Sequence, residues 1–360
     1  MIQLVDLKKQ YLSIKDDIDQ TISSILENSS FIGGEELKNF EKNFANYCQA
    51  KHCLGLANGT VAVELALKAY GIGHGDEVIT VPNTFIATTE SIHHVGAEVK
   101  FVDVDPETYL MDPKLIEQAI TSKTKAIIPV HLYGQICNMK EIKEIAEKYD
   151  LKIIEDTAQG HGAEYFGRKA PICDVATYSF FPAKILGCYG DGGCLVTNDD
   201  ELAEKISLLK DHGRTNKYEH KILGHNYRLD TLQAAILNTK LKYLDSWIEK
   251  RRKNAKIYNR LLEGHVKIPL ELANNKHSYY MYVIRSEKRD ALSEHLKQNN
   301  IATGVHYPIP LHKQLAYKHL QPQTHNHTEK AAKEILSLPM YPELNEEEIQ
   351  FICEKIINFK

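Results

Sequence analysis

Strand-like and helix-like stretches alternate through the first two hundred residues, and this alternation constrains the fold more than any other feature of the sequence. The short apolar runs typical of buried strands are HCLGLA (52–57), DEVITVP (76–82), EVKFVDVD (98–105), AIIPVHLYG (126–134), LKIIED (151–156), DVATYSFF (174–181) and GGCLVTND (192–199). Helical patterns lie between them at 60–71, 86–96 and 139–150, with another at 200–210. Crossover helices of this length indicate mostly parallel strands buried on both faces. We therefore expect an α/β fold with a mostly parallel mixed sheet flanked by helices.

The pattern changes after Asp230. The predicted elements there are a long helical stretch (229–262), strands at 277–285 and 302–307, helices at 289–300 and 345–359, and an exposed polar loop, QPQTHNHTE, at 321–329. This change predicts a large domain over residues 1–235 and a smaller C-terminal α/β domain over 236–360 that includes the linking helix.

Charge and cysteine content narrow the range of partners. Lys and Arg total 44 against 48 Asp and Glu, and the net charge of −4 gives no reason to expect nucleic acid or an anionic membrane as partner. The 7 cysteines are odd in number and scattered, which favours a reducing cytoplasm over a disulfide framework or a zinc site. No export signal and no apolar run of about 18 residues is visible. A small polar ligand is the expected partner.

Unusual residues follow four of the predicted strands, at the ends where ligands bind in an open α/β sheet. They are Asn58-Gly59-Thr60 after 52–57, Asn83-Thr84-Phe85 after 76–82, Glu155-Asp156 at the end of 151–156, and Lys184 shortly after 174–181. Because parallel strands end at the same edge of a sheet, we expect all of these residues on one rim.

Each of these signals has an ordinary structural explanation when it is taken alone. Asn58 can be a helix N-cap, Asp156 a turn cap, Phe85 a core residue, Lys184 a solvated side chain, and the GDGG at 190–193 a tight turn. Together they supply an anion cradle at a helix N-terminus, an aromatic platform, a carboxylate and an amine.

That combination is what pyridoxal phosphate requires of a protein. The phosphate would be held by the helix start at Gly59-Thr60-Val61 and by the Ser179 hydroxyl. Asp156 would keep the pyridine nitrogen protonated, Phe85 would stack on the ring, and Lys184 would bond covalently to the aldehyde. When an incoming amine displaces Lys184, the released lysine is placed to move a proton.

Two rival chemistries lack their expected sequence patterns. A dinucleotide-binding oxidoreductase needs G-x-G-x-x-G after a strand and before a helix, but GIGHGDEV (71–78) follows a helix and precedes a strand, and no P-loop is present. The histidine pairs at 93–94, 220 with 225, and 325 with 327 have no convincing third ligand, so we expect no metal site.

The chain resembles the DegT/StrS family of pyridoxal-phosphate-dependent sugar aminotransferases over essentially its whole length. The stretches that carry the resemblance are ANGTVAVELAL, GIGHGDEVITVPNTFIAT, GAEVKFVDVDPETYLMD, IIEDTAQGHGA, SFFPAKILGCYGDGG, GHNYRLDTLQAAIL, TGVHYPIPLH and LSLPMYPEL. The resemblance implies the aspartate-aminotransferase type of fold (fold type I) and a homodimer with active sites at the subunit interface.

The resemblance also implies roles for single residues. Lys184 matches the lysine that bonds to the cofactor, Asp156 the partner of the pyridine nitrogen, and Gln159 the residue beside the ring hydroxyl. Ser179 and Thr60 match phosphate ligands. Asn226 matches an asparagine that reaches the phosphate of the neighbouring subunit's cofactor. Family members with histidine in place of the lysine act as dehydratases, and Lys184 argues against that branch.

For a substrate, the resemblance implies a nucleotide-linked keto-sugar aminated by L-glutamate, in glycan, lipopolysaccharide or O-antigen precursor biosynthesis. The segment 303–312 looks more like members that aminate the third sugar carbon than the fourth, although Tyr227 departs from a serine found in several of them. We expect His306 and Tyr307 to contact the sugar nucleotide. Arg228 would either pair with an anionic group of the substrate or form a surface ion pair. An aminotransferase acting on a non-sugar ketone and a cofactor-binding regulatory protein without turnover stay open as alternatives.

Overall fold

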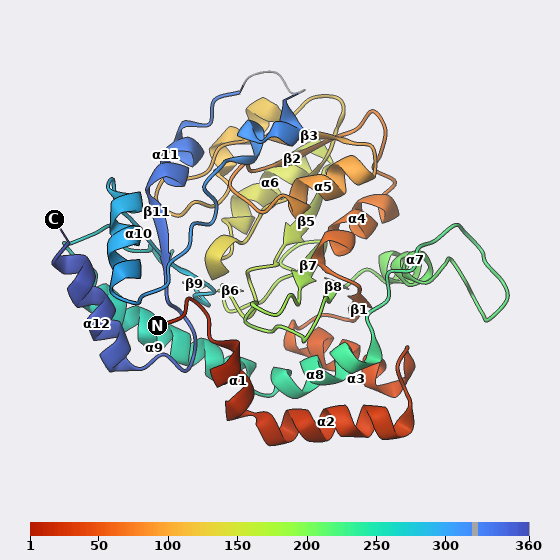
Figure 1. Cartoon of the computed structure of the whole chain (residues 1–360). Coiled ribbons are helices and arrows are strands. Elements are labelled where there is room, and N and C mark those ends of the chain that lie inside the picture. Colours follow the sequence, from red (N-terminus) through yellow and green to blue (C-terminus); the bar gives the residue numbers. More distant parts are fainter. Residues whose placement is uncertain (319–322, 360) are drawn as a thin grey trace.

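The computed structural model describes residues 1–318 and 323–359, and a seven-stranded sheet lies at its centre (Figure 1). Its strands are β1 (His52–Leu56), β2 (Glu77–Thr80), β3 (Glu98–Phe101), β4 (Thr124–Ile127), β5 (Lys152–Asp156), β7 (Val175–Ser179) and β8 (Gly193–Thr197). Their order is β1-β8-β7-β5-β4-β2-β3. Only β8 runs antiparallel to its neighbours in this sheet, while the other pairs are parallel. The predicted α/β architecture with a mostly parallel mixed sheet is confirmed.

Helices cover both faces of this sheet. On one face lie α4 (Gly59–Ala69), α5 (Ala87–His94) and α7 (Asp200–Lys210), and on the other lie α3 (Gly34–Tyr47), α6 (Met139–Tyr149) and α8 (Thr231–Leu241). Alternate strand residues supply the two cores: Leu54, Val78 and Ile154 pack toward the first face, and Cys53, Ile79 and Ile153 toward the second. Burial on both faces explains why the strands read as continuous apolar runs.

The C-terminal part of the chain has a core of its own. Its elements are α9 (Leu244–Leu262), β10 (Tyr282–Arg285), α10 (Arg289–Gln298), α11 (Asn326–Glu334), β11 (Ile335–Leu338) and α12 (Glu346–Ile357). β10 and β11 pair antiparallel, and Tyr258, Ile284 and Leu338 belong to the shared core. The packing partners change along α9, because Ile248 packs with the large sheet and Ala255 with the C-terminal core. The predicted division at residue 236 stays a prediction.

The N-terminal segment forms α1 (Leu7–Ser13) and α2 (Lys15–Asn28), which, like α3, were not predicted from the sequence. The α2 helix lies beside α8, where Thr21 and Thr239 share a hydrogen bond of 2.8 Å. The first residues instead pair with the C-terminal part: Ile2 bridges Ile301, and Met340 donates its N–H to Leu4. Both chain ends accordingly lie on the α12 side of the molecule (Figure 1).

Several predicted elements differ in the structure, among them the strand predicted at 277–285, which is confined to β10. The long helix predicted over 229–262 is interrupted between α8 and α9, where the Tyr243 N–H bonds to Lys240, three residues back. The strand predicted at 302–307 is reduced to one bridge between Gly304 and Ser337, because the residues after it turn toward the large domain. In the loop predicted at 321–329, residues 321–322 lie outside the described residues, and α11 already begins at Asn326.

The early start of α11 has a physical cause in the Asp103 carboxylate. Asp103 follows β3 and accepts the backbone N–H groups of His327 (2.9 Å) and Thr328 (3.0 Å) in the first turn of the helix. Burial alone would raise the pKa of Asp103, but the hydrogen bond from the Thr328 hydroxyl (2.7 Å), together with these backbone bonds, lowers it. A carboxylate distant in sequence therefore caps this helix.

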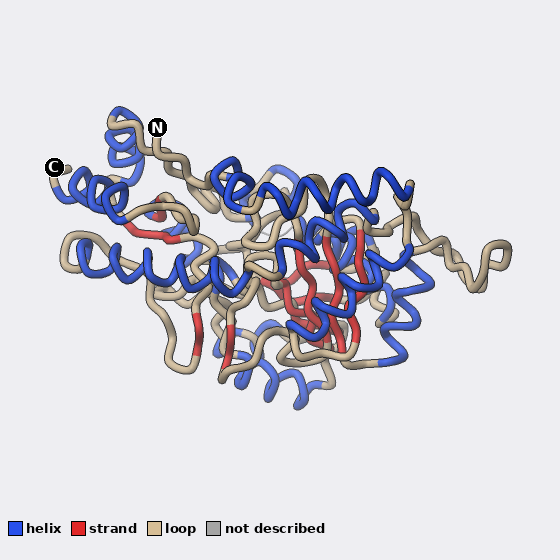
Figure 2. Tube along the Cα trace, turned by 90° about the horizontal axis from the view of Figure 1, so that it is seen from below, coloured by secondary structure: helices blue, strands red, loops and turns tan. Residues whose placement is uncertain are grey.

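An arm, defined here as residues 211–227 between α7 and α8, extends away from the body of the molecule (Figures 1 and 2). Large apolar side chains stand exposed on it: Tyr218 is 80% exposed and Leu223 is 97% exposed. The arm is fixed at its base, where the Ala57 N–H bonds to Tyr227 at 2.9 Å and the His225 ring lies 3.0 Å from Lys68 Nζ.

A short pair of strands, β6 (Glu164–Tyr165) and β9 (Asn275–Lys276), completes the fold. No helix among residues 1–318 and 323–359 is long and apolar enough to cross a membrane.

Candidate active site

The four strands that precede the unusual residues all point the same way. The strands β2, β4, β5 and β7 are mutually parallel, and β1 runs parallel to β7 because each pairs antiparallel with β8 between them. Their carboxyl ends therefore meet at one edge of the sheet, as predicted. This edge carries Gly59, Phe85, Asp156, Ser179 and Lys184.

Asp156 is the last residue of β5 and is only 8% exposed. Its Oδ2 accepts a hydrogen bond of 2.7 Å from the Thr88 hydroxyl, and its Oδ1 accepts one of 3.1 Å from the Ala158 N–H. Its backbone N–H bonds to Pro129 at 2.9 Å, so main chain and side chain are both fixed. A carboxylate oxygen can accept more than one hydrogen bond, so both oxygens of Asp156 can still accept a hydrogen bond from a ligand.

Both polar atoms of the Gln159 side-chain amide make hydrogen bonds within the protein. Its Oε1 accepts the Tyr133 N–H at 2.9 Å, and its Nε2 donates to the Tyr307 hydroxyl at 3.2 Å. These two bonds orient the amide and leave one N–H of Nε2 for a further acceptor. Burial, together with the neighbouring Tyr280 and Asp156, raises the pKa of Tyr307 well above that of a phenol in water, so its hydroxyl stays protonated.

The segment that was predicted as a strand brings His306 and Tyr307 into this site. The Tyr307 ring lies 6.0 Å from the Phe85 ring at a tilt of 39°. His306 Nδ1 lies 2.9 Å from the Ser337 hydroxyl, and the Tyr133 hydroxyl donates to the His306 carbonyl. Phe85 itself is 55% exposed, so it is not the core residue that its type would suggest, and its ring is accessible to a ligand.

Lys184 lies in the turn that follows β7. Its backbone N–H bonds to Phe181 at 2.8 Å, and its Nζ lies 4.8 Å from the centre of the Tyr280 ring. The fully buried Arg251 fixes this part of the chain, because its Nη1 donates to the carbonyls of Tyr280 (3.3 Å) and Met340 (2.8 Å). Lys184 is therefore a half-buried amine over an aromatic face, not a freely solvated side chain.

The positive charge of Lys184 acts on two histidines, the fully buried His161 and the partly buried His306. Burial, reinforced by Lys184, lowers the pKa of His306 to about 4 and that of His161 to about 3. His161 packs between Tyr178 and Phe180, and neither of its ring nitrogens makes a hydrogen bond of normal geometry to the described residues. The Ser179 backbone opposes the pKa shift of His161 only weakly. Both imidazoles are therefore neutral at physiological pH.

The start of α4 is packed so tightly that it requires glycine at two positions. A Cβ added to Gly59 would lie 2.9 Å from Ser179 Cβ, and one added to Gly193 would lie 2.3 Å from the Asn58 carbonyl carbon. Asn58 caps the helix by accepting the Val61 N–H at 3.0 Å, so an anion here would compete with Asn58 for that amide. The backbone of the first turn can thus approach an anion beside Ser179, at the positive end of an 11-residue helix.

Arg228 and Asn226 lie at the base of the arm, next to the end of β1. Arg228 bridges Leu56 and donates from Nη1 to Asp211 Oδ1 at 2.5 Å, while its Nε is buried without a hydrogen bond to the described residues. The ion pair that was one of the two expectations for Arg228 is therefore present. Asn226 is exposed and bridges Asp211, without a side-chain bond to the other described site residues.

The residues present fit pyridoxal phosphate. The glycine-lined cradle at Gly59 and Gly193 is a place that a Cβ would fill, and it lies beside a hydroxyl. The rim also carries a buried acid, an oriented amide and a half-buried amine. No cluster of three or more histidine, cysteine or acidic side chains that could hold a metal ion is found within residues 1–318 and 323–359.

Several residues of the site were missed by the sequence reading. They are Thr88, Tyr133, His161, Arg251 and Tyr280. Thr84, which was on the predicted rim, lies shortly before α5, and its four-residue spacing from the Thr88 hydroxyl could have identified Thr88. Tyr280 and Arg251 come from distant parts of the chain, and no local pattern marks them.

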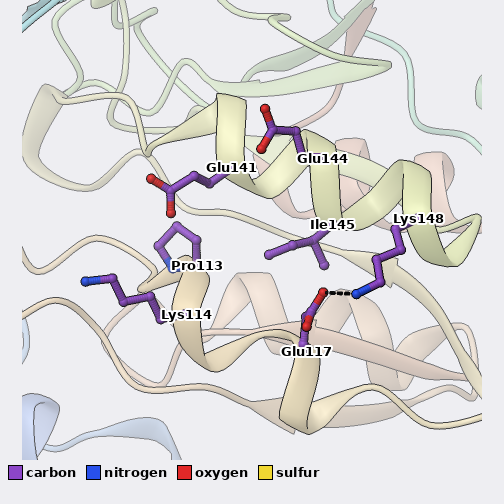
Figure 3. A pocket seen from close by; sticks show the side chains of 7 residues that line it. All are labelled: Pro113, Lys114, Glu117, Glu141, Glu144, Ile145 and Lys148. Atoms are coloured by element: carbon purple, nitrogen blue, oxygen red, sulfur yellow. Dashed lines mark hydrogen bonds and ion pairs between the residues drawn. The ribbon is translucent and has the colours of Figure 1, made fainter.

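A separate pocket of about 320 Å³ lies between α6 and the short helices η1 (Pro113–Leu115) and η2 (Glu117–Ala119) (Figure 3). It is lined by Pro113, Lys114, Glu117, Glu141, Glu144, Ile145 and Lys148. The pair of Lys148 and Glu117, 2.7 Å apart, closes part of it. None of its residues belongs to the rim described above, so this pocket is not part of the active site.

A family model and several known proteins match nearly the whole chain. The model of the DegT/DnrJ/EryC1/StrS aminotransferase family matches residues 12–357. A protein of Geobacillus stearothermophilus named a pleiotropic regulatory protein is 49% identical, over 99% of this chain and 98% of its own length. The UDP-2-acetamido-2-deoxy-3-oxo-D-glucuronate aminotransferase of Pseudomonas aeruginosa is 44% identical, over 99% of this chain and 100% of its own.

Two solved structures show the same fold along nearly the whole chain. The crystal structure of Streptomyces venezuelae DesV in complex with a ketimine intermediate has a TM-score of 0.97 and 38% identity, over 99% of this chain and 97% of that one. The structure of Bacillus subtilis NtdA with bound cofactor PMP has a TM-score of 0.89 and 34% identity, over 96% of this chain and 81% of that one.

Proposed function

Because this chain belongs to the DegT/DnrJ/EryC1/StrS aminotransferase family, we propose that it transfers an amino group from L-glutamate to the third carbon of a nucleotide-linked keto-sugar. Its class and cofactor follow from that membership: it is a pyridoxal-phosphate-dependent sugar aminotransferase with fold type I. The observation that carries the proposal is that Asp156 ends β5 and Lys184 follows β7, two strands that end at one rim, with Tyr280 beside Lys184 and Tyr307 near Asp156. We propose that the product serves glycan precursor synthesis.

When bound, pyridoxal phosphate supplies an aldehyde that exchanges amino groups and a ring that takes up electrons. The Gly59 and Thr60 amides and the Ser179 hydroxyl would hold its phosphate, with Val61 contributing if its amide leaves Asn58. Asp156 would face the ring nitrogen, and the remaining N–H of Gln159 would face the ring hydroxyl. Phe85 offers the exposed face on which the ring stacks.

Lys184 is the residue that holds and moves the proton. A primary amine over the Tyr280 ring can bond to the aldehyde and, once displaced by the incoming amine, can take a proton from one carbon and return it to another. The neutral imidazoles of His161 and His306 are poor competitors for that proton at physiological pH. Lys184 is thus the site's principal base once released.

The sugar nucleotide is proposed to bind at His306, Tyr307 and Arg228. His306 and Tyr307 stand beside Lys184 and Phe85, where a keto group must lie to react. An anionic group of the substrate would share Arg228 with Asp211, which uses only one nitrogen of the planar guanidinium. Two features support amination at the third carbon: the pattern of residues 303–312, and the 3-oxo substrate in the name of the P. aeruginosa relative.

We propose that the enzyme is a homodimer in which Asn226 reaches the phosphate of the partner's cofactor. The support is the arm, whose base is fixed by Tyr227 and His225 while its exposed Tyr218 and Leu223 have no cover within the described chain. Large apolar side chains held away from the body indicate a contact with another molecule. A second copy would cover them.

A regulatory role without turnover is the competing proposal, since one relative bears a regulatory name. A single-turnover test with the holoprotein and a panel of amino donors separates the two. Conversion of the bound cofactor to its amine form by L-glutamate supports the enzyme, and a cofactor that no donor converts supports the regulator.

The direct test of the substrate is incubation of the holoenzyme with L-glutamate and matched nucleotide-linked 3-keto and 4-keto sugars, followed by mass spectrometry and NMR of the product. We expect a 3-amino sugar and release of 2-oxoglutarate. Amination at the fourth carbon overturns the regiochemistry, and amination of simple 2-oxo acids alone overturns the sugar substrate.

A further inference from the structure

The hydroxyl of Thr88 bonds directly to the acid of the active site. Thr88 Oγ1 donates to Asp156 Oδ2 at 2.7 Å, and Thr88 is only 1% exposed. An ionised carboxylate has no proton to give, so the hydroxyl must be the donor. A hydrogen bond to a charged group inside a protein is among the stronger ones, since water does not compete for it.

A second threonine completes a chain of hydroxyls. Thr84 Oγ1 lies 2.9 Å from Thr88 Oγ1, and Thr84 is also buried. Because the Thr88 proton is directed to Asp156, Thr84 must donate to the Thr88 oxygen. The direction of the chain is therefore fixed: Thr84 donates to Thr88, and Thr88 donates to Asp156. Each bond polarises the next and strengthens it.

The backbone locks this chain of hydroxyls to the aromatic platform. The Thr88 N–H bonds to the Phe85 carbonyl at 3.2 Å, at the beginning of α5. Thr84, Phe85 and Thr88 thus belong to one turn. The turn sets the position of the exposed Phe85 ring and of the donor to Asp156 together.

We propose that Thr88, supported by Thr84, is a positioning residue that orients Asp156 and stabilises its charged carboxylate by hydrogen bonding. This inference rests on the proposed role of Asp156 opposite the ring nitrogen of the cofactor. A hydrogen bond from Thr88 stabilises the charged form of the carboxylate that would face the ring, and a charged carboxylate there favours a protonated ring nitrogen. The protein would thereby keep the ring positively charged without a metal or a second acid.

Three variants separate this role from a general effect on packing. Thr88→Val keeps the shape and removes the donor, while Thr88→Ser keeps the donor and removes a methyl group. Thr89→Val is the matched control, since Thr89 is a fully buried threonine of the same helix whose hydroxyl bonds to Ile86 and Tyr317 instead of Asp156.

The readout is the 15N chemical shift of holoprotein loaded with cofactor labelled at the ring nitrogen, together with the cofactor's dissociation constant and kcat. For Thr88→Val we expect the shift to move toward that of a neutral pyridine, with a kcat about tenfold to a hundredfold lower. Thr88→Ser should restore both values, and Thr89→Val should leave the 15N shift unchanged. Thr84→Val should change the shift in the same direction by a smaller amount.

The possible failures are distinguishable. If the wild-type ring nitrogen is itself neutral, the proposed role of Asp156 fails and the inference fails with it. If the wild-type ring is protonated and Thr88→Val leaves the shift unchanged, the inference alone is wrong. Equal shifts in Thr88→Val and Thr89→Val would also overturn it, because they would show a packing effect.

Discussion

Gly59 at the start of α4 lies against Ser179 at the end of β7 so closely that a Cβ on the glycine would come within 2.9 Å of Ser179 Cβ and 3.2 Å of its Cα. Real side chains essentially never approach so closely, and the Ser179 backbone is held in the sheet. The contact therefore sets how near the amides of α4 come to the Ser179 hydroxyl. Those are the two groups proposed to hold the cofactor phosphate.

Gly59→Ala tests this contact. The added methyl group must push α4 away from β7, and we expect a cofactor dissociation constant at least about tenfold higher and a loss of about 1–3 kcal/mol in the free energy of unfolding. Titration of the apoprotein with pyridoxal phosphate measures the first quantity, and urea unfolding the second. Gly190→Ala is the control, since its methyl group would meet only the flexible Gln233 side chain, at 3.3 Å. Equal affinities for the two variants would contradict the cradle.

Asp156→Asn tests the acid. The amide keeps the size of the side chain and can still accept the Thr88 bond, but it lacks the charge that is proposed to face the ring nitrogen. We expect the variant to bind cofactor while kcat falls by about a hundredfold or more, because the ring loses its counter-charge. Steady-state kinetics with the donor and the keto-sugar provide the measurement. Turnover at the wild-type rate would refute the role of Asp156.

His161 makes the stability of the fold dependent on pH. Its pKa is about 3 in the folded protein, against about 6.5 in the unfolded chain. Below pH of about 6.5 the unfolded state takes up a proton that the folded state refuses, so the free energy of unfolding falls as the pH falls. The slope from His161 is about 1.4 kcal/mol per pH unit and ends near its folded pKa. His306 adds a similar slope down to a pKa of about 4.

His161→Phe should remove its part of that slope. The phenyl ring matches the surroundings of Tyr178 and Phe180 and lacks the two ring nitrogens without hydrogen bonds. We expect unchanged or higher stability at neutral pH and a smaller difference between neutral and acidic pH than in the wild type. Urea unfolding of the apoprotein at a series of pH values provides the test. A parallel pH dependence in both proteins would mean that His161 already carries a proton when folded.

Asn226→Ala tests the shared active site. In a homodimer whose sites borrow Asn226 from the partner, each Asn226→Ala or Lys184→Ala dimer is impaired at both sites. A mixed dimer of the two variants carries one site that has both native residues, so each mixed dimer should have about half of the activity of a wild-type dimer. The assay follows activity after subunit exchange. If activity does not return although mixed dimers form, Asn226 serves its own subunit.

The sequence reading located residues whose place depends on one strand and its end. Asp156 and Lys184 lie at or after the ends of buried strands, and the rule that parallel strands end at one edge was enough to gather them, whereas Gln159 was expected from the family resemblance alone. The glycines at 59 and 193 were noticed, but only the structure shows that each is required by a close approach of α4 to the sheet. The sequence pattern indicated turns at these glycines, and the packing in the structure explains why a larger residue would not fit there.

Residues that act through contacts between distant segments were out of reach. Tyr280 lies over Lys184 because Arg251 holds its carbonyl, and neither residue has a sequence neighbour in the site. The strand expected at 302–307 has a strand-like pattern, yet the bonds of His306 to Ser337 and of Tyr307 to Gln159 draw it into the site. Side-chain bonds of this kind override local propensity.

The most direct test of the central claim is chemical trapping of Lys184. Borohydride reduction of the holoprotein should attach the cofactor irreversibly to one lysine, and peptide mapping should place it on Lys184. Lys184→Arg, which keeps a positive charge near Tyr280 but has no primary amine, should show no label and no turnover. A label on any other lysine of the wild-type protein, or label retained by Lys184→Arg, would contradict the account.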